Sequence, residues 1–198
     1  QNYAVFGQAT YQFTEALSLT GGLRYTWDDL TFAHTRAPAV NATNGLPATG
    51  PGTNGNPAGG TIASGGNGTN TSRGETTNGN LSGKAVLQFK PADDIMLYGS
   101  YTRGYKGPAF NVFFNHTAPN NAVPISEELS DSYEVGIKSQ FLDRRVQLNL
   151  AAFTVEYDGF QANNFVLLNG AVITNLTNAG TVRTKGFELD TLVNAADG

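Results

Sequence analysis

The chain contains no cysteine, so disulfide bonds and metal sites built on thiolates are excluded. Charged residues make up only 14% of it, against about 25% in an ordinary globular domain. No basic stripe is present that would attract nucleic acid. No apolar run approaches the roughly 18 residues that a transmembrane helix requires. A membrane-spanning β-strand needs only about 9–11 residues of alternating polarity, and that possibility remains.

The chain is instead rich in glycine, with 24 residues, and in aromatic side chains, at 11%. Apolar and polar residues alternate over 3–13 and again over 17–28. This period of two predicts β-strands, and the short link at 14–16 predicts an antiparallel hairpin. No signal peptide opens the sequence, because Gln1 leads directly into the first alternating run. We therefore expect the chain to be a portion of a longer protein.

Seven wall strands are predicted, with an additional β-hairpin in 164–176. The seven alternating runs span residues 3–13, 17–28, 81–90, 95–105, 129–142, 146–157 and 181–193. In 146–157 the apolar residues change parity near Ala151-Ala152, and in 95–105 the two faces cannot be assigned. A β-bulge is one explanation for each irregularity.

The connections alternate strictly between short and long. Short turns are expected at 14–16, 91–94 and 143–144, and long loops at 33–80, 106–127 and 159–178. The first long loop is mostly Gly, Asn and Thr and cannot bury enough apolar surface to fold alone. A linker between domains is the alternative, but similar strands resume directly after it. Residues 1–198 are therefore interpreted as a fragment of a single β-barrel domain, with a long Gly/Asn/Thr-rich extracellular loop at 33–80. Outer-membrane barrels show this separation of short turns from long loops.

The aromatic spacing fits the thickness of a membrane. Tyr133 and Phe141 lie on one parity, about 26 Å apart along a strand. A tilt of about 40° reduces this to roughly 20 Å of height, close to the ~25 Å apolar band of such barrels. Two rings of outward-facing aromatic residues are therefore predicted, one containing Tyr3, Trp27 and Tyr133 and the other Phe13, Phe89 and Phe141.

Four sequence runs carry a resemblance to a known family. They are ALSLTGGLRYTWD (16–28), LYGSYTRGYKGPAFN (97–111), SDSYEVGIKSQFLDRRVQLNLAAFTVEYDGFQ (130–161) and NAGTVRTKGFELD (178–190). In this order, and with their hairpin turns, these runs resemble the barrel strands of TonB-dependent receptors. The resemblance implies an antiparallel up-and-down transmembrane barrel in the bacterial outer membrane, of which this chain supplies about seven of an expected 22 strands.

The resemblance also implies a function. Receptors of this kind take up a scarce nutrient, such as a ferric siderophore or another iron chelate. They are powered by the TonB complex acting through a plug domain, which is absent from this sequence. Outer-membrane lipid and lipopolysaccharide are the other expected partners. A passive porin or structural outer-membrane barrel is the competing function. A soluble β-sandwich or lectin is a third class, which the segregated loop lengths disfavour.

No enzyme active site is expected. His34 and His116 lie on different loops without metal-ligand spacing, and the Gly-rich segment 50–74 lacks the ending of a phosphate-binding loop. No catalytic residue, metal site or cofactor is therefore predicted.

The loop 106–127 is the best candidate for substrate binding, because it gathers a cation and aromatic side chains near a strand end. The candidate residues are Lys106, Phe110, Phe113, Phe114 and His116. Large apolar side chains on a loop suggest contact with a ligand or plug, although they also fold loops onto themselves or their neighbours.

A second candidate site contains Arg183 and Lys185, which share parity with Phe187 and Leu189. If those two face lipid, the basic pair lies outside the barrel, just beyond the apolar band. There it could contact lipopolysaccharide phosphates, or the two side chains could simply extend toward water.

Overall fold

The computed structural model describes residues 1–36, 70–111, 123–168 and 171–194, in which the regular elements are β-strands. Within these residues, no helix is long and apolar enough to cross a membrane. The strands are β1 (Asn2–Gln12), β2 (Leu17–Arg36), β3 (Asn70–Ala92), β4 (Ile95–Lys106), β5 (Glu128–Phe141), β6 (Val146–Asp158), β7 (Gln161–Leu168), β8 (Ala171–Asn178) and β9 (Val182–Val193).

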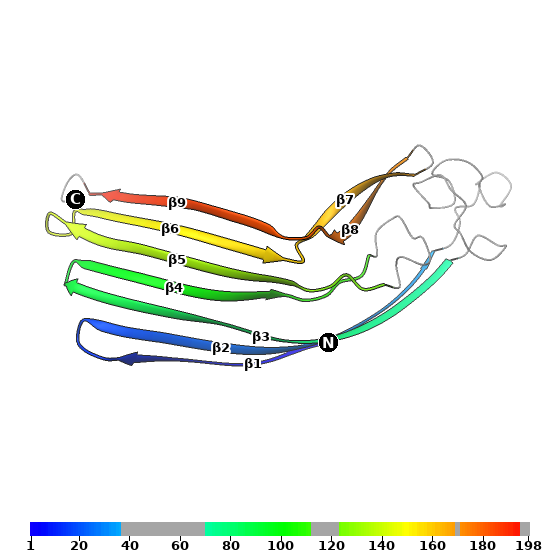
Figure 1. Ribbon diagram of the computed structural model, residues 1–198, viewed down its shortest axis with the longest axis horizontal. Coiled ribbons are helices and arrows are strands. Elements are labelled where there is room, and N and C mark those ends of the chain that lie inside the picture. The colour runs from blue at the N-terminus through cyan, green and yellow to red at the C-terminus, as the bar shows by residue number, and fades with distance from the viewer. Residues whose placement is uncertain (37–69, 112–122, 169–170, 195–198) are drawn as a thin grey trace.

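Seven of these strands form one antiparallel sheet in the order β1-β2-β3-β4-β5-β6-β9. β7 and β8 pair only with each other, as a hairpin between the neighbouring strands β6 and β9 (Figure 1). The predicted seven wall strands and the additional hairpin are both confirmed. The hairpin is longer than the predicted 164–176 because its pairing begins at Gln161 and Asn178.

The three short turns lie together at one end of the sheet, and the strand ends that lead into the long connections lie at the other end, together with the β7–β8 hairpin (Figure 1). The first turn is fixed by Thr14, whose Oγ1 accepts a hydrogen bond of 3.0 Å from the backbone N–H of Leu17. In the third turn Leu142, Asp143 and Arg144 all have positive φ, between 53° and 67°. The predicted segregation of turns and loops is confirmed.

The predicted bounds of the loop at 33–80 are wrong at both ends. β2 continues to Arg36 and β3 begins at Asn70, and these two residues are paired. Backbone hydrogen bonds between adjacent strands hold this extension, and they do not require the apolar alternation on which the prediction relied. Residues 37–69 lie outside the described part.

No bulge occurs in β6, whose register is continuous with both β5 and β9. The change of parity is therefore real, and it places Phe153, Val155 and Tyr157 on the face opposite to Leu148 and Leu150. The pairing of β4 with β5 is also continuous, and the register shift lies between Phe89 and Ala92 in β3. The suggested bulge in 95–105 is likewise absent from the paired residues of β4 and β5.

The register separates the sheet into an apolar face and a polar face. A single row on the apolar face contains Leu19, Leu87, Gly99, Val135, Ala152 and Phe187. The apolar face is more exposed than the polar face. On β5, Tyr133 and Val135 of the apolar face are 56% and 62% exposed, while Glu134 of the polar face, between them in sequence, is half-buried. This order is the reverse of that in a water-soluble sheet and is expected of a wall whose outer face contacts lipid.

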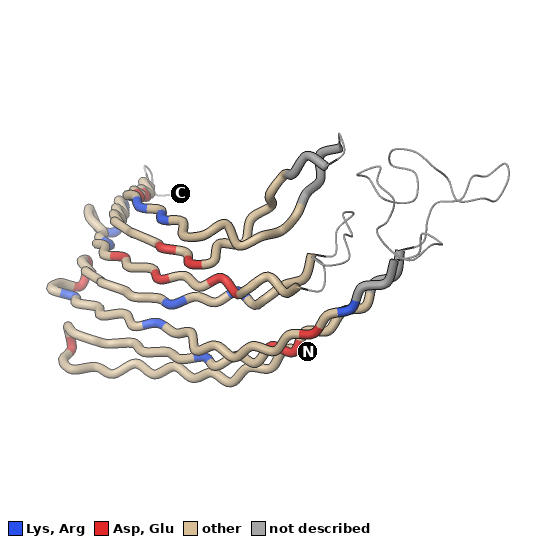
Figure 2. The backbone as a smooth tube through the Cα atoms, turned by 45° about the vertical axis from the view of Figure 1, so that its right-hand side comes forward, with Lys and Arg blue, Asp and Glu red and all other residues tan. Residues whose placement is uncertain are grey.

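The six aromatic residues predicted to form two outward rings are all exposed. Tyr3 is paired with Trp27, which brings these two members of one ring to the same height on neighbouring strands. Figure 2 shows the sheet as a curved wall with only scattered charges along its strands. The buried apolar side chains of the described residues are Phe110 and Ile125, at 7% and 8% exposure, and they lie at the long-loop end rather than within the sheet.

Candidate functional site

The polar face of the sheet carries a network of hydrogen bonds between strands. Tyr98 donates a hydrogen bond of 2.6 Å from its hydroxyl to Glu134 Oε1, and Lys138 Nζ lies 5.6 Å from the centre of the Tyr98 ring. Asn149 donates through Nδ2 to Asp190 Oδ2 at 3.1 Å. Such a surface suits a water-filled or plugged lumen, where charged groups remain partly solvated.

At the long-loop end, β4, β5 and β7 are tied together by Gln161, which is only 7% exposed. Its Nε2 donates to the carbonyl oxygens of Gly107 and Ser126, each at 2.9 Å. Its backbone N–H donates to Glu128 Oε2 at 2.7 Å. One side chain thus fixes the start of the hairpin against both ends of the segment 107–126.

Asn178, at the other end of the same hairpin, repeats this arrangement. Its Nδ2 donates to the carbonyl oxygens of Ser126 and Gly159, at 3.0 and 2.6 Å, and its Oδ1 accepts from the Ser126 N–H at 2.9 Å. Gly159 has a φ of +66°, a region that residues with a side chain rarely adopt. We call Gly107, Ser126, Glu128, Gln161 and Asn178 the loop junction.

A small apolar cluster lies beside the loop junction. The Phe110 ring packs against Phe32 of the long β2–β3 hairpin, with ring centroids 4.6 Å apart. Ala109 and Ile125 form an isolated antiparallel bridge. Asn111 donates through Nδ2 to Asn175 Oδ1 and the Leu176 carbonyl, both at 3.3 Å. Three separate loop regions therefore meet around Phe110 and are held in fixed positions.

The structure places two of the five predicted substrate-binding residues. Lys106 forms an ion pair with Glu128, with Nζ 3.5 Å from Oε2, and its side chain remains 55% exposed. Phe110 is buried, which supports local packing for this residue. Phe113, Phe114 and His116 lie outside the described residues. Substrate contact by this loop stays a prediction.

Arg183 and Lys185 lie on the apolar face at its long-loop end. Arg183 is paired in register with Glu156, and its Nε donates to Glu156 Oε2 at 2.6 Å. In the same register row, Arg103 lies 3.4 Å from Asp131 through Nη1 and Oδ2. Contact with lipopolysaccharide at these positions is also still a prediction.

Sequence reasoning missed the loop junction and the partners of Arg183. Gln161 and Asn178 carry no motif, and their partners lie 19 to 54 residues away in the chain. The ion pairs of Arg183 and Arg103 form between adjacent strands, so only the register could reveal them. Within the described residues, no group of three His, Cys, Asp or Glu side chains could hold a metal ion.

The comparisons with known proteins agree with this geometry. Residues 1–196 match the family described as TonB dependent receptor-like, beta-barrel. The ferric yersiniabactin uptake receptor FyuA from Yersinia pestis is similar over 100% of this chain and 24% of its own, with 21% identity and a TM-score of 0.71.

Two further solved structures have the same fold. The ferric-catecholate import receptor Fiu from Escherichia coli K12, in its closed form, covers 98% of this chain with 26% of its own, at 18% identity and a TM-score of 0.65. The siderophore receptor PiuA from Acinetobacter baumannii covers 99% with 23% of its own, at 18% identity and a TM-score of 0.61. This chain spans about a quarter of the length of the structures it matches.

The predicted fold class and location are both confirmed. The sheet matches part of the barrel wall of these receptors, with its apolar face toward lipid and its polar face toward the lumen. The family is one of transport proteins and not of enzymes. The chain belongs to the TonB-dependent receptor family, as a portion of the β-barrel that spans the bacterial outer membrane.

Proposed function

We propose that this chain is part of the wall of an active receptor that imports a scarce nutrient as a metal chelate, with a ferric siderophore as the first candidate. The observation that carries the proposal is the family match over residues 1–196. The names of FyuA, Fiu and PiuA add weight, because each states that the protein takes up a ferric chelate or is a siderophore receptor. Energy would come from the TonB complex acting through a plug domain.

The geometry is compatible with this function. The polar face offers a hydrogen-bonding surface to a lumen, and the loop junction holds the segment after β4 and the β7–β8 hairpin in fixed positions at the outer mouth. Fixed loops lower the entropic cost of ligand binding, since less of the loop must be ordered when the ligand arrives. A binding vestibule at this end is the use that best fits the arrangement.

Uptake of radioactive iron chelates by cells that carry the full-length receptor tests the proposal. We expect uptake of at least one ferric chelate that stops when TonB is deleted or the proton gradient is dissipated. Uptake that continues unchanged without TonB would indicate a passive porin and refute active transport. If the receptor imports no ferric chelate but takes up a cobalt or copper compound in a TonB-dependent manner, active transport stands and only the proposed substrate is wrong.

The predicted contact with substrate is tested in the same full-length protein by replacing Phe113, Phe114 and His116 with alanine. Phe110 is left intact because it is buried, and its loss would disturb the loop itself. Losing an aromatic anchor typically costs about 2 kcal/mol or more, which is roughly thirtyfold in affinity for the chelate. Lys84→Gln, an exposed change on the polar face far from this loop, is the control. Unchanged affinity in the folded triple variant would assign these residues to packing only.

A further inference from the structure

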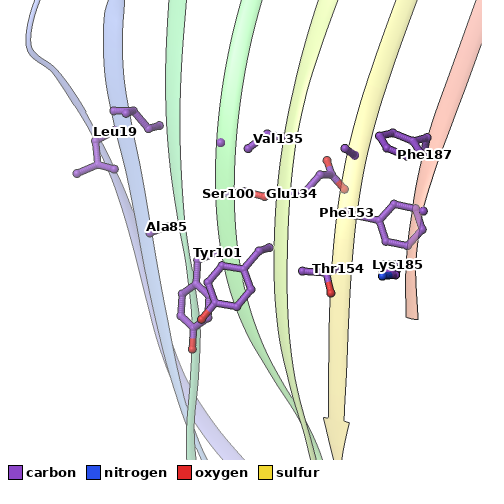
Figure 3. A pocket seen from close by; sticks show the side chains of 15 residues that line it. Leu19, Ala85, Ser100, Tyr101, Glu134, Val135, Phe153, Thr154, Lys185 and Phe187 are labelled. Atoms are coloured by element: carbon purple, nitrogen blue, oxygen red, sulfur yellow. The ribbon is translucent and has the colours of Figure 1, made fainter. Parts of the chain in front are cut away.

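Three aromatic rings on the polar face of the sheet each lie over a glycine of the neighbouring strand. These ring–glycine pairs are Phe32–Gly74 in β2 and β3, Tyr98–Gly136 in β4 and β5, and Phe153–Gly186 in β6 and β9. In each pair the two residues are direct partners in the register. In Figure 3 the Phe153 side chain extends from β6 toward β9.

Each ring occupies the space that a side chain on its glycine would need. A Cβ on Gly136 would lie 2.5 and 2.6 Å from Tyr98 Cε1 and Cζ, and a Cβ on Gly186 would lie 3.0 Å from Phe153 Cζ. In the remaining pair, a Cβ on the glycine would lie 2.7 Å from Phe32 Cε1. The rings can therefore rest against the partner backbone only because the partner is glycine.

Among the described residues, the ring–glycine pairs occur only where a long connection joins the two strands. β2 and β3 are joined through residues 37–69, β4 and β5 through 107–127, and β6 and β9 through 159–181. A further contact of this kind lies on the apolar face of β2 and β3, where a Cβ on Gly79 would lie 2.5 Å from the Tyr25 hydroxyl oxygen. All three wall pairs with long connections thus have a ring over a glycine.

The wall pairs that are joined by short turns have no such contact at their described glycines. A Cβ on Gly7 of β1 would meet nothing within 4 Å. In β3 and β4, the atoms nearest to a Cβ on Gly83 or Gly99 belong to no aromatic ring. In β5 and β6, Gly136 is paired with Ala151. The presence of a ring–glycine pair therefore follows the length of the connection.

The length of a connection matters because it decides whether the turn itself fixes the register. A tight turn does so through its own geometry, whereas a long connection closes many registers at similar entropic cost. A slip by two residues keeps every side chain on its own face, so the alternation of apolar and polar residues does not exclude it. In β6 and β9 such a slip would place the Phe153 ring against Thr184 or Glu188. Gly186 is the only glycine of β9, so one register alone allows the contact.

We propose that the ring–glycine pairs determine the register of the strand pairs that no short turn fixes, while the barrel assembles. Tyr98 shows how such a pair can be selective. Its hydroxyl donates to Glu134 Oε1 at 2.6 Å, and its ring centre lies 5.6 Å from Lys138 Nζ. These two residues flank Gly136 on β5, so the three contacts form together in the native register. This role is independent of the nutrient that the receptor imports.

The test uses β6 and β9 of the full-length receptor, assembled from urea into phospholipid vesicles while pairs of introduced cysteines are oxidised. Leu150 and Leu189 are partners in the register, so a disulfide between Leu150→Cys and Leu189→Cys reports native pairing. Leu150→Cys combined with Phe187→Cys or Thr191→Cys reports the registers that are shifted by two residues. The quantity measured is the ratio of shifted to native disulfide.

Phe153→Leu should raise this ratio about fivefold, which corresponds to about 1 kcal/mol for one cross-strand pair. Gly186→Val should also raise it, because the ring can then no longer lie over this position. In a second receptor, Asn-Gly replaces residues 159–180, so that a two-residue turn joins Asp158 to Thr181. In that receptor Phe153→Leu should leave the ratio unchanged, since the turn fixes the register.

Phe6→Leu is the matched control for the loss of a ring. Phe6 lies on the polar face of β1 and is paired with Arg24 of β2, to which a short turn joins it. Ala9→Cys with Gly21→Cys reports the native register of these strands, and Ala9→Cys with Leu19→Cys reports a shifted one. The ratio of shifted to native disulfide should not change in this control.

The proposal is overturned if Phe153→Leu and Gly186→Val give the same ratio as the unaltered receptor. It is also overturned if Phe153→Leu raises the ratio equally in the receptor with the two-residue turn, since the ring would then stabilise the pair whatever joins the strands. A Phe153→Leu variant that forms no barrel with either connection overturns it too, because the ring would then be required for stability and not for register.

Discussion

Replacing Gln161 with alanine should loosen the outer mouth of the barrel while leaving the wall intact. The Gln161 side chain makes two hydrogen bonds of 2.9 Å, to the carbonyl oxygens of Gly107 and Ser126, and is 7% exposed. No wall strand depends on it, because the pairing of β4, β5 and β6 is carried by their own backbones.

The expected loss of local stability in the Gln161→Ala variant follows from these contacts. Each hydrogen bond contributes about 1 kcal/mol, and the half-buried Gly107 carbonyl would lose its partner. The exposed Ser126 carbonyl can return to water, and it also accepts from Asn178. The sum is about 2 kcal/mol of local stability, or roughly thirtyfold in the equilibrium for opening of the loop. The backbone bond from Gln161 to Glu128 survives in this variant.

Hydrogen exchange of the full-length receptor measures this opening. The amides of Ala109 and Ile125, which bond to each other's carbonyl oxygens at 3.1 and 2.7 Å, should exchange about thirtyfold faster. Amides of β4 and β5 should be unchanged. Gln8→Ala, on exposed β1, is the control. Unaltered exchange at Ala109 and Ile125, or equal acceleration throughout the wall, would refute the assigned role of Gln161.

Three further results are expected. Phe110→Ala should destabilise the same loop region by about 3 kcal/mol, because a buried ring is lost, with increased proteolysis after β4 as the readout. Tyr105→Phe removes the 2.5 Å hydrogen bond from the Tyr105 hydroxyl to Asp28 Oδ2. Because the acceptor is charged, this should lower the local stability by about 2 kcal/mol, measured by hydrogen exchange of the neighbouring amides. Gly159→Ala should destabilise the base of the β7–β8 hairpin by at least about 1 kcal/mol, measured in the same way, because φ is +66° there and the new Cβ would lie 2.7 Å from the Glu127 carbonyl oxygen.

The wall could be predicted from the sequence because its physical cause is local. The alternation of apolar and polar side chains in 17–28 identifies the two faces of a strand, and turns such as 91–94 can be recognised by their composition. Strand order then follows from antiparallel neighbours joined by short turns. This reasoning also gave the hairpin between the strands now described as β6 and β9.

The loop junction and the ion pairs could not be predicted in this way. Gln161 acts through partners that are distant in the chain, and nothing in its sequence neighbourhood distinguishes it from a solvated glutamine. The parity change in β6 was visible but was ascribed to a possible bulge. The structure shows a regular strand, in which Glu156 lies on the apolar face and Phe153 on the polar face.

The β7–β8 hairpin leaves and rejoins the wall at adjacent points. Thr181 Oγ1 donates to Asp158 Oδ1 at 2.9 Å, and the Phe160 and Ala179 amides donate to the carbonyl oxygens of Gly180 and Phe160, at 2.9 and 2.7 Å. β6 and β9 pair with each other without any help from the segment between them. Gln161 and Asn178, at the two ends of the hairpin, anchor the loop junction, whereas the wall strands do not depend on the residues between these two. A change of sequence between Gln161 and Asn178 would alter the long-loop end of the sheet and leave the pairing of β6 with β9 unchanged.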